Sequence, residues 1–93
     1  GITMIELGGN IKLINFDSLE PALLIVVKKV VGNYTKKISE SLQDFKGIIV
    51  TLEDKQQNKI KVKVTADKVY EAEATEKNLF FALDKALGAI LKQ

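Results

Sequence analysis

Apolar and polar residues alternate strictly in three segments of the second half of the chain. The segments are Gly47 to Glu53, Lys59 to Thr65 and Val69 to Thr75. A period of two residues is typical of β-strands, in which successive side chains point to opposite faces. The connections, Asp54 to Asn58 and Ala66 to Lys68, are polar and short. We therefore predict consecutive antiparallel hairpins that share the middle strand.

The same alternation predicts the register of the strands. If Thr65 pairs with Val69, aliphatic side chains gather on one face and charged side chains on the other. The expected apolar pairs are Val64 with Tyr70, Val62 with Ala72, Ile60 with Ala74, Leu52 with Ile60, Val50 with Val62 and Ile48 with Val64. The expected charged pairs are Lys63 with Glu71, Lys61 with Glu73 and Glu53 with Lys59. Each pair of opposite charges contributes about 0.2 to 1 kcal/mol, and the charged face is close to neutral.

Apolar residues at helical spacing follow Asp17 and Ser18. Either side chain can cap the free amides of a helix, and Pro21 is tolerated in a first turn, so we predict a helix that ends near Leu42. Its expected buried stripe comprises Leu23, Val27, Val30, Val31, Tyr34, Ile38 and Leu42. Gly32 lies in mid-helix, where glycine costs about 1 kcal/mol relative to alanine. Either a neighbour packs closely against Gly32 or the cost is tolerated.

A second helix is expected after Thr75, which can cap it. Its predicted buried stripe comprises Leu79, Leu83, Ala86, Leu87 and Ile90. Near the amino terminus, Thr3 to Leu7 and Ile11 to Phe16 are strand-like, and Gly8-Gly9-Asn10 separates them. This part of the chain is either one bent strand or a short strand with an extended arm.

The expected order of elements is β-α-β-β-β-α. We predict an α+β fold in two layers, with a four-stranded mixed sheet and two helices on one of its faces. The first helix then crosses over between parallel strands. With 93 residues the chain fits a single domain, residues 1–93.

All 14 basic residues are lysine, against 12 acidic residues. Lysine is a hydrated point charge without the bidentate geometry of arginine, so nucleic-acid binding here would depend on phosphates and shape. The chain has no Cys and no His, which excludes thiolate and imidazole catalysis and Cys/His zinc sites. No two carboxylates are spaced to share an apolar cleft. We expect no enzymatic activity, no cofactor, no metal site and no small-molecule substrate.

The longest apolar stretch, Ala22 to Val27, is too short to span a bilayer. Residues Gly1 to Gly9 do not resemble a signal peptide, and Met4 is a candidate natural start. We expect a cytoplasmic protein without membrane contact.

The helices offer the best candidate surface for a polyanion. On the helical wheel, Lys28, Lys29 and Lys36 lie opposite the buried stripe of the first helix, with Lys37 at the edge and Glu40 as the only nearby acid. Lys85 and Lys92 of the second helix can extend this surface. The functional interpretation is an electrostatic platform for phosphates. The alternative is an ordinary solvated helix face.

Two apolar residues fall on the same outward side, namely Ile25 and Phe81. They can form an exposed patch for a partner protein or a homodimer, and Phe81 can stack on a base. Alternatively, one or both fill the groove between the helices. An exposed sheet edge is a further candidate for self-association.

The segment YEAEATEKNLFFALDKALGAILKQ, Tyr70 to Gln93, resembles the last strand and helix of the ribosome hibernation promoting factors. These are also called ribosomal subunit interface or ribosome-associated inhibitor proteins. Phe80, Ala82, Leu83 and Asp84 fill the family's pattern of an aromatic, a small, an aliphatic and an acidic residue. The element order and spacing from EPALLIVVKKVVGNYTKKI through GIIVTLED are similar to the family's domain as well, so the resemblance covers most of the chain.

This resemblance implies binding to small-subunit ribosomal RNA near the subunit interface and restraint of translation. The chain departs from the family at Phe81, where a small residue is usual, and in its lack of arginine. The double-stranded RNA-binding domain has a similar α-β-β-β-α core. Its basic cluster at the start of the last helix is reduced here to Lys77, which makes it the weaker comparison.

Overall fold

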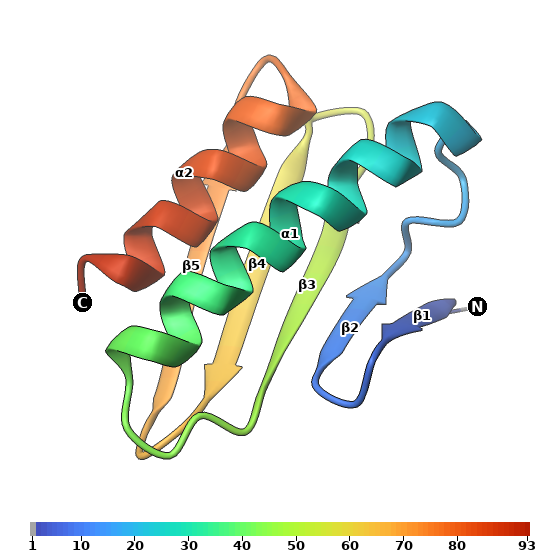
Figure 1. Cartoon of the computed structure of the whole chain (residues 1–93). Coiled ribbons are helices and arrows are strands. Elements are labelled where there is room, and N and C mark those ends of the chain that lie inside the picture. The colour runs from blue at the N-terminus through green and yellow to red at the C-terminus, as the bar shows by residue number, and fades with distance from the viewer. Residues whose placement is uncertain (1) are drawn as a thin grey trace.

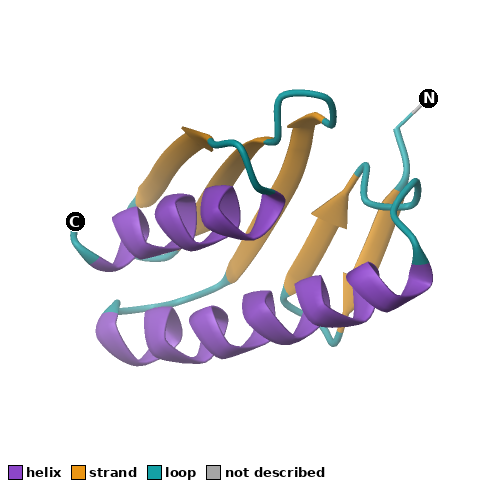
Figure 2. Cartoon of the chain, turned by 90° about the horizontal axis from the view of Figure 1, so that it is seen from above, coloured by secondary structure: helices purple, strands orange, loops and turns teal. Residues whose placement is uncertain are grey.

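A computed structural model describes residues 2–93 and shows a five-stranded sheet with two helices on one of its faces (Figure 1). The elements are β1 (Met4–Leu7), β2 (Ile11–Ile14), α1 (Pro21–Ser41), β3 (Gly47–Asp54), β4 (Lys59–Thr65), β5 (Val69–Thr75) and α2 (Leu79–Leu91). The strands lie in chain order across the sheet, and β2 pairs with β3 in parallel through the α1 crossover. The view from above separates the helical layer from the sheet (Figure 2). The predicted α+β class is confirmed.

The prediction of four strands is wrong by one, because β1 and β2 form an antiparallel hairpin at the sheet edge. Gly8 has a φ of 63°, a left-handed conformation that glycine adopts without steric cost. The chain reverses there, and Leu7 lies opposite Ile11. Neither a bent strand nor an extended arm describes this arrangement.

Asn15 redirects the chain so that Phe16 reaches the core. Leu13 and Phe16 are both fully buried, although residues three apart in a regular strand point to opposite faces. Asn15 breaks the alternation with a φ of 68°, a conformation that asparagine tolerates better than most residues. Its backbone N–H donates to the carbonyl oxygen of Thr3 at 3.0 Å, which holds this bend against the start of the chain.

The register of the β3–β4–β5 meander is as predicted for all apolar pairs. The predicted pairing of Glu53 with Lys59 is wrong, because a register shift between Leu52 and Asp54 places Asp54 opposite Lys59. Such a bulge adds one residue to one strand and moves the following side chains.

Charged side chains alternate in sign on the face of the sheet that the helices leave open. Lys63 lies opposite Glu71, and Lys61 lies opposite Glu73, as predicted. The ammonium of Lys61 is 3.8 Å from the carboxylate of Glu71, so the ion pair runs diagonally. These acids and bases keep the open face close to neutral.

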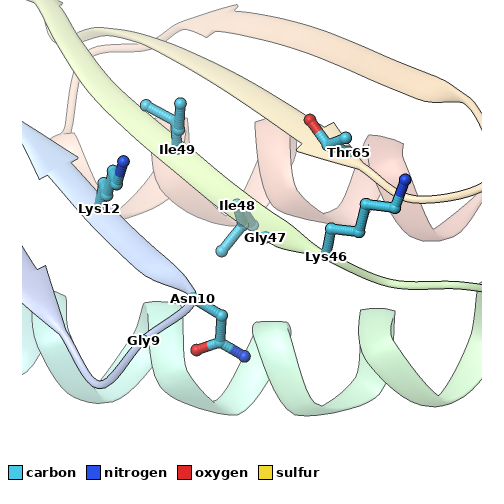
Figure 3. Close-up of a pocket in the computed structure, with 8 residues that line it drawn as sticks. All are labelled: Gly9, Asn10, Lys12, Lys46, Gly47, Ile48, Ile49 and Thr65. Carbon is cyan, nitrogen blue, oxygen red and sulfur yellow. The ribbon is translucent and has the colours of Figure 1, made fainter.

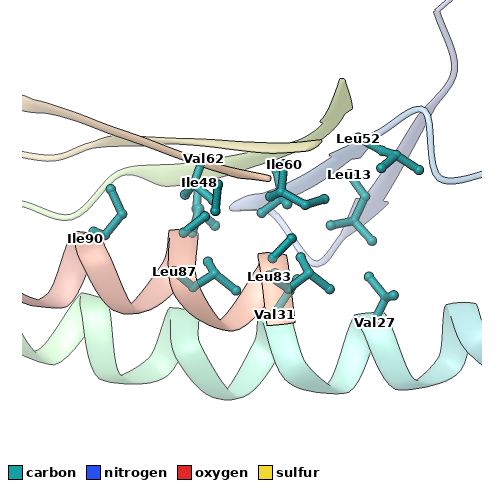
Figure 4. Close-up of a cluster of buried hydrophobic side chains, with 14 of the residues drawn as sticks. Leu13, Val27, Val31, Ile48, Leu52, Ile60, Val62, Leu83, Leu87 and Ile90 are labelled. Carbon is teal, nitrogen blue, oxygen red and sulfur yellow. The ribbon is translucent and has the colours of Figure 1, made fainter. Parts of the chain in front are cut away.

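The hydrophobic core fills the space between the sheet and the helices (Figure 4). Side chains of α1 and α2 point toward the sheet in this view, and those of the strands point toward the helices. Labelled members of the core are Leu13, Val27, Val31, Ile48, Leu52, Ile60, Val62, Leu83, Leu87 and Ile90. The predicted stripe of α2 is correct except that Leu79 is only partly buried and Ala82, which was not predicted, is fully buried.

The buried side of α1 is rotated slightly from the prediction. Leu23 is 40% exposed, whereas Leu24 packs against the core. Thr35 is buried as well, and its Oγ1 has no hydrogen-bond partner among the described residues. The helical wheel missed this rotation because Leu23 and Leu24 are equally apolar.

The capping residues of both helices differ from the prediction, although Pro21 lies in the first turn of α1 as predicted. α1 begins at Pro21 after Glu20, whose side chain makes no capping hydrogen bond, and Asp17 instead accepts a hydrogen bond from Thr3. α2 is capped by Asn78, whose Oδ1 accepts from the backbone N–H of the second and third helical residues. Thr75 remains in β5.

Replacing Gly32 by alanine is expected to stabilise the protein. A Cβ at Gly32 would meet nothing within 4 Å, so no neighbour requires the glycine. Alanine should raise the free energy of unfolding by roughly 0.5 to 1 kcal/mol through helix propensity and backbone entropy. Urea unfolding measures this change.

Gly47→Ala is the matched control. A Cβ at Gly47 would lie 3.2 Å from the backbone oxygen of Asn10, a contact that neither strand can relieve easily. This variant should be less stable than the wild type. The packing described for these two glycines would be contradicted if Gly47→Ala were more stable than the wild type and Gly32→Ala were less stable.

Candidate nucleic-acid interface

The outward side of α1 carries lysines that form no ion pair. Lys29, Lys36 and Lys37 are exposed, whereas Lys28 is half-buried. Within residues 2–93 no carboxylate is in ion-pair contact with any of the four. The predicted lysine surface of α1 is therefore a region of net positive charge, in which Lys29 and Lys36 are accessible and the exposed Glu40 is the one acid of the helix.

Lys37 differs from its neighbours because it contacts an aromatic ring. Its ammonium lies 5.8 Å from the centroid of the Tyr34 ring. A cation over an aromatic face at an exposed site contributes about 0.5 to 1 kcal/mol. The charge stays available to solvent, but the side chain is less free than those of Lys29 and Lys36.

The two predicted lysines of α2 have different surroundings. The ammonium of Lys85 lies 3.1 Å from the carboxylate of Glu76, so much of its charge is compensated. Lys92 is exposed beyond the end of α2 and forms no ion pair within residues 2–93. Lys92 therefore extends the positive surface more effectively than Lys85.

A shallow depression of about 600 Å³ lies on the outer surface of the helices. Phe81, Lys85 and Lys92 line it together with Tyr34 of α1 and the acids Glu76 and Asp84. Phe81 is 66% exposed, so the interpretation that it fills the groove between the helices is wrong. The depression brings an accessible aromatic face close to a free lysine.

Ile25 does not line this depression and is 66% exposed, so it does not fill the interhelical groove either. Leu23 and Val26 are exposed beside it in the first turns of α1. Sequence reasoning missed this larger apolar patch because it placed Leu23 in the buried stripe.

Tyr34 and Asp84 join the helices across the depression. The hydroxyl of Tyr34 donates a hydrogen bond to the Asp84 carboxylate. This carboxylate therefore has a structural role, because it links α2 to α1. The hydrogen bond, with smaller contributions from burial and the negative charge of Asp84, raises the pKa of Tyr34 from 10.0 to about 12. Within residues 2–93 Asp84 forms no ion pair with a lysine, and its partner is this phenol.

The raised pKa predicts a pH-dependent contact between the helices. The folded state holds the phenol proton more tightly than the unfolded state, so this stabilisation is complete below pH 10 and is lost as the pH rises toward 12. Tyrosinate absorbance in a Tyr70→Phe variant isolates Tyr34, since the chain has 2 tyrosines. We expect Asp84→Asn to lower the pKa of Tyr34 toward 10.0. An unchanged titration would contradict the assigned hydrogen bond.

Comparisons of the chain with family models, with curated proteins and with solved structures each gave no significant match. Residues 2–93 contain no group of three or more acidic, His or Cys side chains placed to hold a metal ion. Neither α1 nor α2 is long and apolar enough to cross a membrane. The candidate interface is therefore described by its lysines, by the exposed ring of Phe81 and by the depression on the helices.

Proposed function

We propose that this chain is a non-enzymatic RNA-binding protein that associates with ribosomes in the cytoplasm. The helical surface contacts phosphates of small-subunit ribosomal RNA through Lys29, Lys36 and Lys37, with Lys28 and Lys92 adding charge at its margins. Association of this kind restrains translation in the manner of a hibernation factor. RNA is held by charge and shape, because the chain has no arginine for bidentate recognition.

The observation that carries this proposal is the contrast between the two faces of the molecule. Lysines on the sheet stand opposite glutamates, as Lys63 does with Glu71. The helix α1 carries four lysines and a single acid, Glu40. A surface with net positive charge attracts a polyanion, whereas lysines matched by an equal number of acids do not.

The fold supports the proposal in a second way. From β2 to α2 the elements follow the order β-α-β-β-β-α, with a parallel first pair of strands and both helices on one face. This is the arrangement implied by the resemblance of Tyr70 to Gln93 to the hibernation factors. The hairpin partner β1 is an addition at the edge.

Co-sedimentation with purified small ribosomal subunits tests the proposal. The wild-type protein is expected to pellet with the subunits at low salt and to be released as the salt concentration rises. Failure to pellet at low salt, or pelleting that does not depend on salt, would overturn the proposal. A parallel run with large subunits shows whether the small subunit is preferred.

A protein-interaction or homodimerisation function is the second candidate. It is favoured by the exposed apolar side chains of Leu23, Ile25 and Val26 on α1, and by Phe81 on α2. Apolar association is insensitive to screening by salt. Sedimentation equilibrium of the wild type and an Ile25→Ser variant distinguishes it, because a salt-stable dimer that the variant loses would favour this function over RNA binding.

A further inference from the structure

A second concentration of lysine lies at one end of the sheet, away from the helical surface. Lys12 of β2 and Lys46, which precedes β3, line a hollow of about 230 Å³ together with Thr65 at the end of β4 (Figure 3). In this view both lysine side chains extend to the same side, whereas Asn10 and Ile48 point the other way, toward α1. Segments far apart in the chain therefore place two ammonium groups around one hollow.

The hollow has no acidic lining. Its residues are Gly9, Asn10, Lys12, Lys46, Gly47, Ile48, Ile49 and Thr65. Glu6 faces Lys12 across the β1–β2 pair, yet within residues 2–93 neither Lys12 nor Lys46 forms an ion pair. The Thr65 hydroxyl adds a neutral hydrogen-bond donor. These groups suit an anion with several oxygen atoms.

Glycines keep the hollow open. Gly47 lies at the first position of β3, where a side chain would collide with the backbone oxygen of Asn10 at 3.2 Å. That same oxygen accepts a hydrogen bond from the Ile48 N–H at 2.9 Å, so β3 is held close to the turn before β2. Gly9 leaves open space on the other side. The approach of these two segments brings Lys12 and Lys46 to one hollow, which the side chain of Ile49 also lines.

We propose that this hollow binds a phosphate group through Lys12, Lys46 and Thr65. Lysine ammonium groups and hydroxyls are common donors to phosphate oxygens, and hydrogen bonds with charged partners are stronger than neutral ones. The phosphate belongs either to a nucleotide or to an RNA backbone. The inference goes beyond the proposed function, because it requires none of the lysines on α1 and lies on a different part of the molecule.

Titration of the isotope-labelled full chain with pyrophosphate, followed by amide chemical shifts, tests this site. We expect saturable shifts centred on Gly47, Ile49 and Thr65. A Lys12→Gln, Lys46→Gln variant should bind at least about tenfold more weakly, since each lysine contributes a charged hydrogen bond. The amide spectrum of the variant also reports whether its fold is intact.

The matched control removes the same charge at the other end of the meander. Lys59→Gln with Lys77→Gln is expected to keep the affinity for pyrophosphate. The helical variant Lys29→Glu with Lys36→Glu should keep it as well, so the failure of one proposal can be told from the failure of the other. The phosphate site is overturned if no saturable shifts occur, or if either of these variants weakens pyrophosphate binding as much as the loss of Lys12 and Lys46.

Two further titrations identify the source of the phosphate. Adenosine monophosphate and a short single-stranded RNA are compared under the same conditions, each with the wild type and the Lys12→Gln, Lys46→Gln variant. If the nucleotide binds more tightly, as judged from the amides of Gly47, Ile49 and Thr65, the site takes a small-molecule phosphate. If the RNA binds more tightly, the site contacts an RNA backbone. If neither ligand shows dependence on Lys12 and Lys46, the site does not bind phosphate esters and the proposal fails.

Discussion

Exchanging Lys29 and Lys36 for glutamate is expected to lower the affinity for small-subunit ribosomal RNA by at least about 100-fold at low salt. Each lysine is exposed and forms no ion pair with the described residues, so each is free to contact a phosphate. Loss of one charged hydrogen bond costs about 1.5 kcal/mol or more, which is roughly tenfold in affinity. The introduced carboxylates add repulsion of the phosphates.

Filter binding or fluorescence anisotropy with a ribosomal RNA fragment measures this change. The control variant Lys59→Glu with Lys77→Glu alters the net charge equally and should reduce the affinity far less. Equal losses in the two variants would show that RNA responds only to net charge. An unchanged affinity in the α1 variant would remove α1 from the binding surface.

Replacing Phe16 by alanine is expected to lower the free energy of unfolding by about 3 to 5 kcal/mol, more than any other substitution proposed for this protein. Phe16 is fully buried between the sheet and the helices, and it reaches that position only through the left-handed Asn15. A domain of this size has a total stability of about 5 to 14 kcal/mol. The variant should therefore unfold at a much lower urea concentration than the wild type.

Phe81→Ala is the control for the loss of an aromatic ring. Phe81 is 66% exposed, so its removal should change the free energy of unfolding by less than about 1 kcal/mol. Urea unfolding followed by far-ultraviolet circular dichroism measures both variants. Similar destabilisation by the two substitutions would contradict the placement of Phe16 in the core.

The meander was predictable because its signals are local. Alternation from Gly47 to Thr75, interrupted by short polar turns, determines which residues face the core and which strand positions pair. The one error, at Glu53, arose because a bulge shifts the register without changing the alternation before it. A sheet in which the inward positions are apolar and the outward positions are polar or charged tolerates few other arrangements.

The first part of the chain was less predictable because its geometry depends on contacts between distant residues. The burial of Phe16 requires the left-handed conformation of Asn15, which is supported by a hydrogen bond to Thr3. Asn78 rather than Thr75 caps α2, since β5 continues through Thr75. Several residues near each helix start have capping side chains, and sequence alone does not distinguish among them.

The candidate sites were likewise predictable where the signal is local and unpredictable where distant residues meet. Helical spacing was enough to place Lys29 and Lys36 on the outward side of α1. It was not enough to reveal that Lys85 pairs with Glu76, because that contact joins α2 to the loop before it. Lys12 and Lys46 are brought together only by the parallel approach of β2 and β3.

The salt dependence of binding to small ribosomal subunits tests the central claim most directly, namely that the lysines of α1 neutralise RNA phosphates. For the wild type, the logarithm of the association constant should fall linearly with the logarithm of the salt concentration, by about 0.7 to 0.9 for each phosphate neutralised. The Lys29→Glu, Lys36→Glu variant should show a clearly shallower slope. Wild-type binding that is tight but independent of salt, or an identical slope in the variant, would contradict this account.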